Sequence, residues 1–173
     1  KPDEARRLLG SLSYFLRQNV TGTSSDKITI EQELLHVKAF LELIEARFID
    51  RLTINYEIDD TLLYEMIPPF TLQPIVENAI QHGIKDKEEN CLVKITIHKV
   101  QEAIEIQVED NGKGISPVRL QQLGKDKVES EIGTGMGLYN VNRRLIMTFG
   151  KRAALNIKSS QGIGTAISFC IEK

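Results

Sequence analysis

The spacing of apolar residues changes near residue 50, and this change constrains the fold more than any other feature of the sequence. Before it, residues 3–19 and 29–49 place apolar side chains three or four positions apart, as amphipathic helices do. After it, residues 53–58 alternate between apolar and polar, as a half-buried strand does. We therefore expect a helical segment over residues 1–50 and a separate sheet-containing domain over residues 51–173.

Several segments of the second part have clear signals of their own. Helical spacing covers residues 70–84 and 138–149, and strand patterns cover residues 92–100, 103–108, 155–159 and 165–171. Five strands, mainly in adjacent hairpins, with helices among them predict an α+β fold. We expect a two-layer sandwich in which about three helices cover a five-stranded mixed sheet. In the helical segment, Thr29 followed by Gln32 predicts a capping box at the start of the second helix.

Charge and composition exclude several classes of function. The formal charge is -2 over 173 residues, and no run of lysine or arginine exceeds two, so nucleic acid is not expected as a partner. No apolar stretch approaches the roughly 20 residues that cross a bilayer. Cys91 and Cys170 stand alone, without the spacing of a zinc site, and we expect reduced thiols.

The first motif with chemical meaning is Asp110-Asn111-Gly112-Lys113-Gly114, directly after the strand expected to end at Val108. A carboxylate at the end of a strand can accept a hydrogen bond from an exocyclic amine such as the one adenine carries. The two glycines allow a ligand to approach the backbone closely. The alternative is a plain hairpin turn, since Asp-Asn-Gly is common in turns.

The second motif is Gly133-Thr134-Gly135-Met136-Gly137-Leu138, at the start of the helix that ends near Phe149. Glycines that lead into a helix N-terminus expose amide N–H groups where the helix dipole favours phosphate. The motif is not a P-loop, because no Gly-Lys-Ser/Thr closes it, and no strand runs straight into it as in a dinucleotide fingerprint. A flexible linker is the alternative.

The third motif, on the helix expected from residue 70, places Asn78 and His82 four residues apart on one face, with Glu77 in the adjacent row. An asparagine carbonyl is a hard oxygen ligand that suits Mg²⁺ bridging phosphates. The alternatives are that His82 only caps or packs the end of the helix and that Glu77 is a solvated charge.

Together the three motifs resemble the ATP-site boxes of the GHKL superfamily of gyrase, chaperone, histidine kinase and MutL ATPases. The third motif, with Asn78, resembles the N box; the first, Asp110-x-Gly112-x-Gly114, resembles the G1 box; and the second, Gly133-x-Gly135-x-Gly137, resembles the G2 box. Gly162-Ile163-Gly164-Thr165 resembles its last glycine-threonine element. The sequences LQPIVENAIQHG and GTGMGLYNVNRRL are similar to those of the LytS-type sensor histidine kinases. The segment IEQELLHVKAFLELIEARF likewise resembles the helix that precedes the ATP-binding domain in that family. The resemblance covers nearly the whole chain and implies a Bergerat-type ATP-binding fold preceded by helices.

The resemblance also implies a role for each motif residue. Asp110 would receive the adenine amine, with Thr165 beside it through water, and Asn78 would bind Mg²⁺. His82 would flank the phosphates or ribose, and residues 115–134 would form a mobile lid. The remaining expected ATP-binding positions are Gly112, Gly114, Gly133, Gly135, Gly137 and Leu138; Glu77 and His82 are the candidates for a catalytic role, and Asn140 with Arg143 or Arg144 for support of the lid or phosphates.

Two departures from the pattern of the superfamily determine which activity we expect. Hydrolytic relatives carry a glutamate where this chain has Pro74, so a conformational ATPase is disfavoured. None of His36, His82 and His98 lies in a phosphoacceptor motif. We therefore expect a histidine kinase catalytic domain that transfers the γ-phosphoryl group to a histidine upstream of residue 1. A conformational ATPase and a non-catalytic nucleotide-binding scaffold remain the alternatives.

The family further implies partners and a location. The partners would be ATP, the phosphoacceptor helix of the same protein or of a dimer mate, and a response regulator, with a homodimer in the full-length protein. The helical segment would trail the dimerisation region, and the domain would lie in the cytoplasm beneath a membrane anchor.

Overall fold

The computed structural model of the chain describes residues 2–21, 25–48, 51–122 and 135–172. Two helices lead the chain, α1 (Pro2–Thr21) and α2 (Ile30–Phe48). The predicted capping box is confirmed at the start of α2. The Thr29 hydroxyl accepts a hydrogen bond from the Gln32 N–H, and the Gln32 side-chain oxygen accepts one from the Thr29 N–H, each at 3.1 Å. Two of the otherwise unpaired N–H groups of the helix start are thereby satisfied.

A five-stranded mixed sheet forms the centre of the second part, in the order β2-β4-β5-β7-β6. The edge strand β2 runs parallel to β4, and every other neighbouring pair is antiparallel. The predicted α+β class and the five-stranded mixed sheet are therefore confirmed. The strands are β2 (Leu52–Ile58), β4 (Cys91–Val100), β5 (Ala103–Asp110), β6 (Asn156–Ser160) and β7 (Gly164–Glu172).

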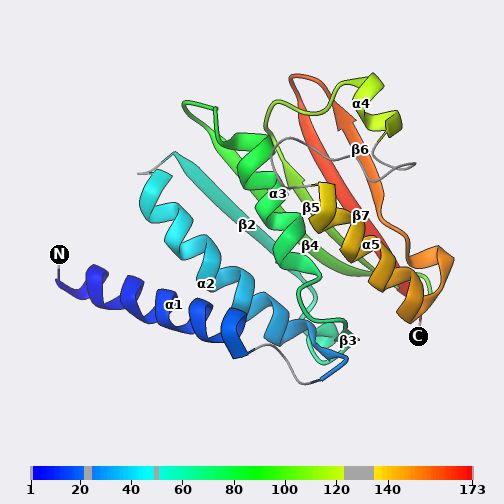
Figure 1. Cartoon of the computed structure of the whole chain (residues 1–173), viewed down its shortest axis with the longest axis horizontal. Helices are drawn as coiled ribbons and strands as arrows, with labels where there is room; N and C mark the ends of the chain where they lie inside the picture. Colours follow the sequence, from blue (N-terminus) through cyan, green and yellow to red (C-terminus); the bar gives the residue numbers. More distant parts are fainter. Residues whose placement is uncertain (1, 22–24, 49–50, 123–134, 173) are drawn as a thin grey trace.

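Helices cover one face of this sheet (Figure 1). The helix expected over residues 70–84 begins at Leu72 and has two parts, the α-helix α3 (Leu72–Asn78) and a π-helix, η2 (Ala79–Ile84). Helix α5 (Gly135–Phe149) lies beside it, and the short α4 (Pro117–Gln122) sits at one end of β6. The described residues also include two 3-10 turns, η1 (Asp60–Leu62) and η3 (Lys151–Ala153).

A second sheet has only two strands, β1 (Ile28–Thr29) and β3 (Met66–Ile67), and was not predicted. Each strand has two residues, which is too short for alternation to be visible in a sequence. The antiparallel pair ties the segment before α2 to the segment before α3.

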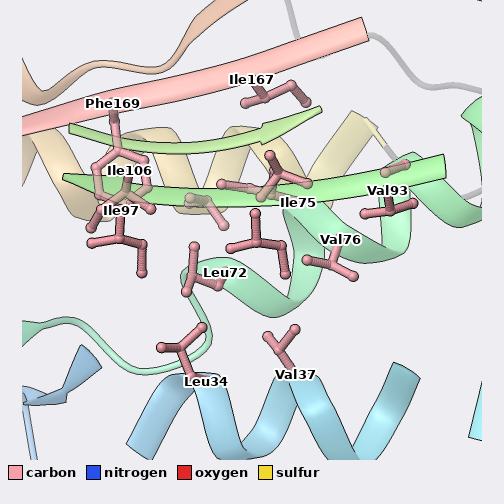
Figure 2. Close-up of a cluster of buried hydrophobic side chains, with 14 of the residues drawn as sticks. Leu34, Val37, Leu72, Ile75, Val76, Val93, Ile97, Ile106, Ile167 and Phe169 are labelled. Atoms are coloured by element: carbon pink, nitrogen blue, oxygen red, sulfur yellow. The ribbon is translucent and has the colours of Figure 1, made fainter. Parts of the chain in front are cut away.

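The core lies between the sheet and the helices, and α2 belongs to it. In Figure 2, Leu34 and Val37 point from α2 toward Leu72 and Val76 of α3. Strand side chains close the cluster from the other side, among them the fully buried Ile97. The opposite face of the sheet is polar and partly exposed, as the alternation predicts. No helix in the described ranges is long and apolar enough to cross a membrane.

Candidate functional site

Asp110 is the last residue of β5, two positions beyond the predicted strand end. The strand continues because Asp110 still pairs with Val93 on β4 and with Thr165 on β7. The carboxylate is therefore attached to a strand held on both sides, which fixes the position of its Cα. The prediction that the strand stops at Val108 was wrong, and the difference strengthens the case for a rigidly held carboxylate.

Three glycines pack so closely at Asp110 and at one another that a Cβ on any of them would overlap a neighbouring atom. An ideal Cβ on Gly83 would lie 2.5 Å from the Asp110 carboxyl carbon, and one on Gly164 would lie 2.0 Å from the Asp110 carbonyl oxygen. A Cβ on Gly112 would lie 2.1 Å from the carbonyl carbon and oxygen of Gly83. We call Gly83, Gly112 and Gly164 the glycine cradle of Asp110. Gly83 was not among the predicted site residues, and its only signal was a glycine directly after His82.

The carboxylate of Asp110 is half-buried and directly hydrogen-bonded. Its Oδ1 accepts the N–H of Gly112 at 2.8 Å. Burial raises the pKa of Asp110, while backbone hydrogen bonds from Gly112 and Thr165 and the positive charge of Lys87 act in the opposite direction. An oriented, desolvated carboxylate of this kind is a strong and selective acceptor for an amine donor.

Thr165 is held by a partner that the sequence did not indicate. Its hydroxyl lies 2.9 Å from the hydroxyl of Ser159 on the neighbouring strand β6. The Ser159 hydroxyl also donates to the carbonyl of Gly164 and accepts the N–H of Ile115, at 2.9 and 2.8 Å. Gly114, at φ 63°, passes so close to Ser160 that a Cβ would lie 2.1 Å from its carbonyl oxygen. The first glycine motif is thus closely packed against the hairpin of β6 and β7.

Asn78, Glu77 and His82 lie along the α3–η2 helix, and all three side chains are half-buried. Asn78 is the last residue of α3 and makes no capping hydrogen bond to η2. Glu77 accepts a hydrogen bond from the side-chain amide of Gln73 at 2.8 Å. The helix widens to π-helical turns directly after Asn78, which the sequence spacing did not indicate.

The second glycine motif is described only in part, because Gly133 lies outside the described residues. Gly135 is the first residue of α5, so the expected glycine-to-helix transition is present there. Gly137 lies against α3, where an added Cβ would be 3.7 Å from the Cβ of Pro74. Leu138, predicted as an ATP-binding position, packs its side chain against the hydrophobic core.

The expected lid over residues 115–134 falls mostly on residues 123–134, outside the described part of the chain. Of the residues expected to support it, Asn140 and Arg143 are exposed. Arg144 points elsewhere: its Nη2 donates a hydrogen bond to the carbonyl of Phe70 at 2.6 Å.

All three motifs meet on the α3–η2 helix. The first glycine motif reaches it through the Lys113 N–H, which donates to the Gly83 carbonyl at 3.1 Å. The second reaches it through Gly137 at Pro74, and the third is the helix itself. A carboxylate acceptor, a hard amide oxygen and a helix N-terminus therefore converge on one helix.

The available side chains fit a magnesium ion that takes most of its ligands from phosphate and water and few from the protein. Within the described ranges, no three His, Cys, Asp or Glu side chains cluster in a way that could hold a metal. The side chain of Asn78 makes no capping hydrogen bond to the helix, so its amide oxygen can serve as a ligand. Mg²⁺ in nucleotide sites typically takes one or two protein oxygens and keeps phosphate and water as its other ligands.

Comparison with known proteins identifies the class to which this fold and site belong. Residues 69–173 match the family described as histidine kinase-, DNA gyrase B-, and HSP90-like ATPase, and residues 1–52 match the histidine kinase family. The histidine kinase domain of the blue-light activated kinase from Erythrobacter litoralis EL346 has a similar fold, with a TM-score of 0.58 at 16% identity over 98% of this chain and 74% of that one. The chain therefore belongs to the histidine kinase-, DNA gyrase B-, and HSP90-like ATPases.

Within that family, the similarity extends to one kind of sensor kinase. The chain is 43% identical to the sensor protein LytS of Bacillus cereus over 171 residues, and 41% identical to the sensor histidine kinase/phosphatase LytS of Staphylococcus aureus over 159 residues. These alignments cover 99% and 91% of this chain but only 29% and 27% of the two relatives. The chain thus groups with the ATP-binding catalytic domains of LytS-type sensor histidine kinases and spans less than a third of such a protein.

Proposed function

We propose that this chain binds ATP with Mg²⁺ and transfers the γ-phosphoryl group to a histidine upstream of residue 1. The observation that carries the proposal is the meeting of three motifs on the α3–η2 helix, through Lys113 at Gly83 and Gly137 at Pro74. Phosphoryl transfer depends on positioning and on neutralising charge more than on covalent chemistry from the protein. A site assembled on one helix meets that requirement.

At the adenine end, Asp110 accepts the exocyclic amine and Thr165 supports it through a bound water. The glycine cradle keeps the carboxylate in place, and Ser159 orients the Thr165 hydroxyl. Because guanine presents a carbonyl oxygen where adenine presents its amine, a carboxylate there discriminates against GTP. This proposal is supported by the half-burial and the hydrogen bonding of Asp110.

At the phosphate end, Asn78 holds the magnesium ion and His82 flanks the phosphates or the ribose. The amide groups at the start of α5, together with Gly133, Gly135 and Gly137, receive the phosphates. A bound Mg²⁺ would supply charge neutralisation at the phosphate oxygens. Glu77 is a candidate for polarising the acceptor.

The outlet for the phosphoryl group is proposed to lie outside residues 1–173. Pro74 stands where a hydrolytic base would be and cannot act as one. His36 is 5% exposed, with the ring centroids of Tyr14 and Phe70 at 5.7 and 6.2 Å from its own, and is not accessible to a phosphate donor. His98 lies on the open face of the sheet, 3.3 Å from Glu105, while the helices cover the other face.

We further propose that residues 1–50 trail the dimerisation and phosphoacceptor region and that residues 51–173 form the catalytic domain. The partners would be the phosphoacceptor helix of the same protein or of a dimer mate and a response regulator. The full-length protein would be a membrane-anchored homodimer with this domain in the cytoplasm. The support for these statements is the similarity to LytS sensor proteins over nearly the whole chain.

The test is a transfer assay with γ-labelled ATP, this chain, and a separate fragment that carries the upstream histidine helix. We expect acid-labile label on that fragment only when Mg²⁺ is present. Asp110→Asn places an amide N–H against the adenine amine and should reduce transfer about tenfold or more, while Glu31→Gln, at an exposed position of α2, should leave it unchanged. Label on His36, His82 or His98, or rapid phosphate release without transfer, would contradict the proposal.

A further inference from the structure

One acidic side chain outside the nucleotide site is completely buried. Glu33, on α2, has 0% of its surface exposed. Its two oxygens accept backbone N–H groups at the start of α3: Oε2 from Phe70 at 3.0 Å and Oε1 from Leu72 at 2.8 Å, with Gln73 more distant at 3.5 Å. A buried carboxylate is costly unless it is hydrogen-bonded in this way.

These donors are the N–H groups that a helix start leaves without an internal partner. The residue in the N-cap position of α3, Thr71, makes no capping hydrogen bond, because its hydroxyl donates to the carbonyl of Pro68 at 2.6 Å. Helix α3 is therefore capped by a side chain that lies 39 positions earlier than Leu72 and belongs to a different helix. A carboxylate at a helix N-terminus is also favoured by the helix dipole.

Arg144 of α5 holds the same residue through its next peptide group. Its Nη2 donates to the carbonyl of Phe70 at 2.6 Å, while Glu33 receives the N–H of Phe70. Burial lowers the pKa of Arg144, and the opposite charge of Glu33 acts in the other direction. Phe70 itself has a φ of 55°, so its backbone is held in an uncommon conformation. We call this arrangement the Phe70 clamp.

Both helices that the clamp joins to α2 lead to the nucleotide. Helix α3 ends at Asn78, and α5 begins at Gly135 within the second glycine motif. Helix α2 is a continuous element of the helical segment, and its Leu34 and Val37 point toward Leu72 and Val76 of α3 (Figure 2). A shift of α2 relative to the sheet would therefore act on both nucleotide-facing helices through Glu33.

We infer that Glu33 and Arg144 are positioning residues of the nucleotide site, which make the affinity for ATP–Mg²⁺ depend on the placement of the helical segment. The inference rests on the proposed function, because it assigns these residues to an ATP site. Neither side chain touches the nucleotide in this scheme; each acts through the backbone of Phe70. The clamp gives a movement of α2 a direct route to Asn78 and to the start of α5.

The test compares Glu33→Gln with the matched control Glu31→Gln, two residues earlier on an exposed position of the same helix. The glutamine keeps the shape of the side chain but turns one acceptor into a donor, which meets either the Phe70 or the Leu72 N–H. Titration calorimetry at a temperature where circular dichroism reports folded protein should give an affinity for ATP–Mg²⁺ lowered about fivefold or more, as is usual for coupled sites. The control should bind as wild type does.

A second measurement separates positioning from plain stabilisation of the fold. By reciprocity, ATP–Mg²⁺ must slow amide exchange in α2 of the wild-type chain, and this protection should be reduced in Glu33→Gln. If Glu33→Gln lowers the melting temperature but binds ATP–Mg²⁺ as tightly as wild type, the inference is overturned. If the wild-type chain binds no ATP, the proposed function fails first.

Should Glu33→Gln not fold, Arg144→Lys tests the same inference at the Phe70 carbonyl. The lysine keeps the charge but loses the planar fork that reaches the Phe70 carbonyl. We expect the same direction of change in ATP–Mg²⁺ affinity and the same loss of α2 protection. Unchanged affinity together with unchanged α2 protection in a folded Arg144→Lys protein would overturn the inference.

Discussion

Replacing Gly83 by alanine tests the glycine cradle with a single methyl group. The added Cβ would stand 2.5 Å from the carboxyl carbon and Oδ1 of Asp110 and 2.9 Å from Oδ2, whereas ordinary contact begins at 3.4 Å. The carboxylate must therefore move by 3.4 minus 2.5, or about 0.9 Å, or rotate away. Gly83 cannot easily retreat, because its carbonyl accepts the Lys113 N–H at 3.1 Å and packs against Gly112.

A displacement of that size is enough to break the hydrogen bonds that orient the carboxylate. The bond from the Gly112 N–H is 2.8 Å long, and hydrogen bonds lose their value by about 3.6 Å. The acceptor for the adenine amine is then misplaced. A hydrogen bond to a charged group contributes about 1.5–3 kcal/mol, so we expect ATP and ADP affinity to fall about 10- to 100-fold.

Calorimetric titration with ATP and ADP, alongside Gly10→Ala, separates this effect from helix propensity. Both glycines lie in helical segments, so alanine favours the helix backbone at both. A Cβ on Gly10 meets no atom within 4 Å, and that variant should bind nucleotide as wild type does. A folded Gly83→Ala protein with wild-type affinity for ATP would refute the placement of the adenine at Asp110.

Two further predictions concern the metal and the pH dependence of stability. Asn78→Ala should weaken ATP binding only when Mg²⁺ is present. It should leave the melting temperature unchanged, because alanine suits a helix. Calorimetry with and without Mg²⁺ checks this, and an equal loss of affinity in both conditions would make Asn78 a structural residue. Burial lowers the pKa of His36 from its usual 6.5, so the unfolded chain binds its proton more readily. The resulting stability is present above about pH 6.5 and is lost as the pH falls through the folded-state pKa. Between pH 7 and pH 5, the free energy of unfolding measured in urea should fall less in His36→Phe than in the wild-type chain. An equal fall in the two proteins would count against this role of His36.

Local patterns in the sequence identify most of the fold. Alternation marks β4 and β5 because one face of each strand is buried against the helices, and the Thr29–Gln32 capping box is readable because both partners lie within one turn. The two-residue strands β1 and β3 offer no such period. The π-helical turn after Asn78 also leaves no mark, since its residues suit an α-helix equally well.

In the candidate site, too, some residues can be recognised from the sequence and others cannot. Asp110 and the glycines are visible as motifs because they are contiguous, so they can be recognised without knowing the fold. Gly83 gains its importance from a strand that comes later in the chain, and Glu33 from a helix start nearly forty residues away. Such roles depend on contacts between distant segments, which a single sequence does not record.

The parallel pairing of β2 with β4 has a consequence for how the molecule assembles. Hairpins such as β4–β5 can form from neighbouring residues, but β2 meets β4 only after residues 59–90 have crossed between them. That crossover contains α3 and η2, hence Asn78 and Gly83. Long crossovers close late, because their entropy is lost before distant contacts can compensate for it. The segment that contains Asn78 and Gly83 therefore lies inside the loop that the pairing of β2 with β4 closes, and we expect this pairing to form later than the β4–β5 hairpin.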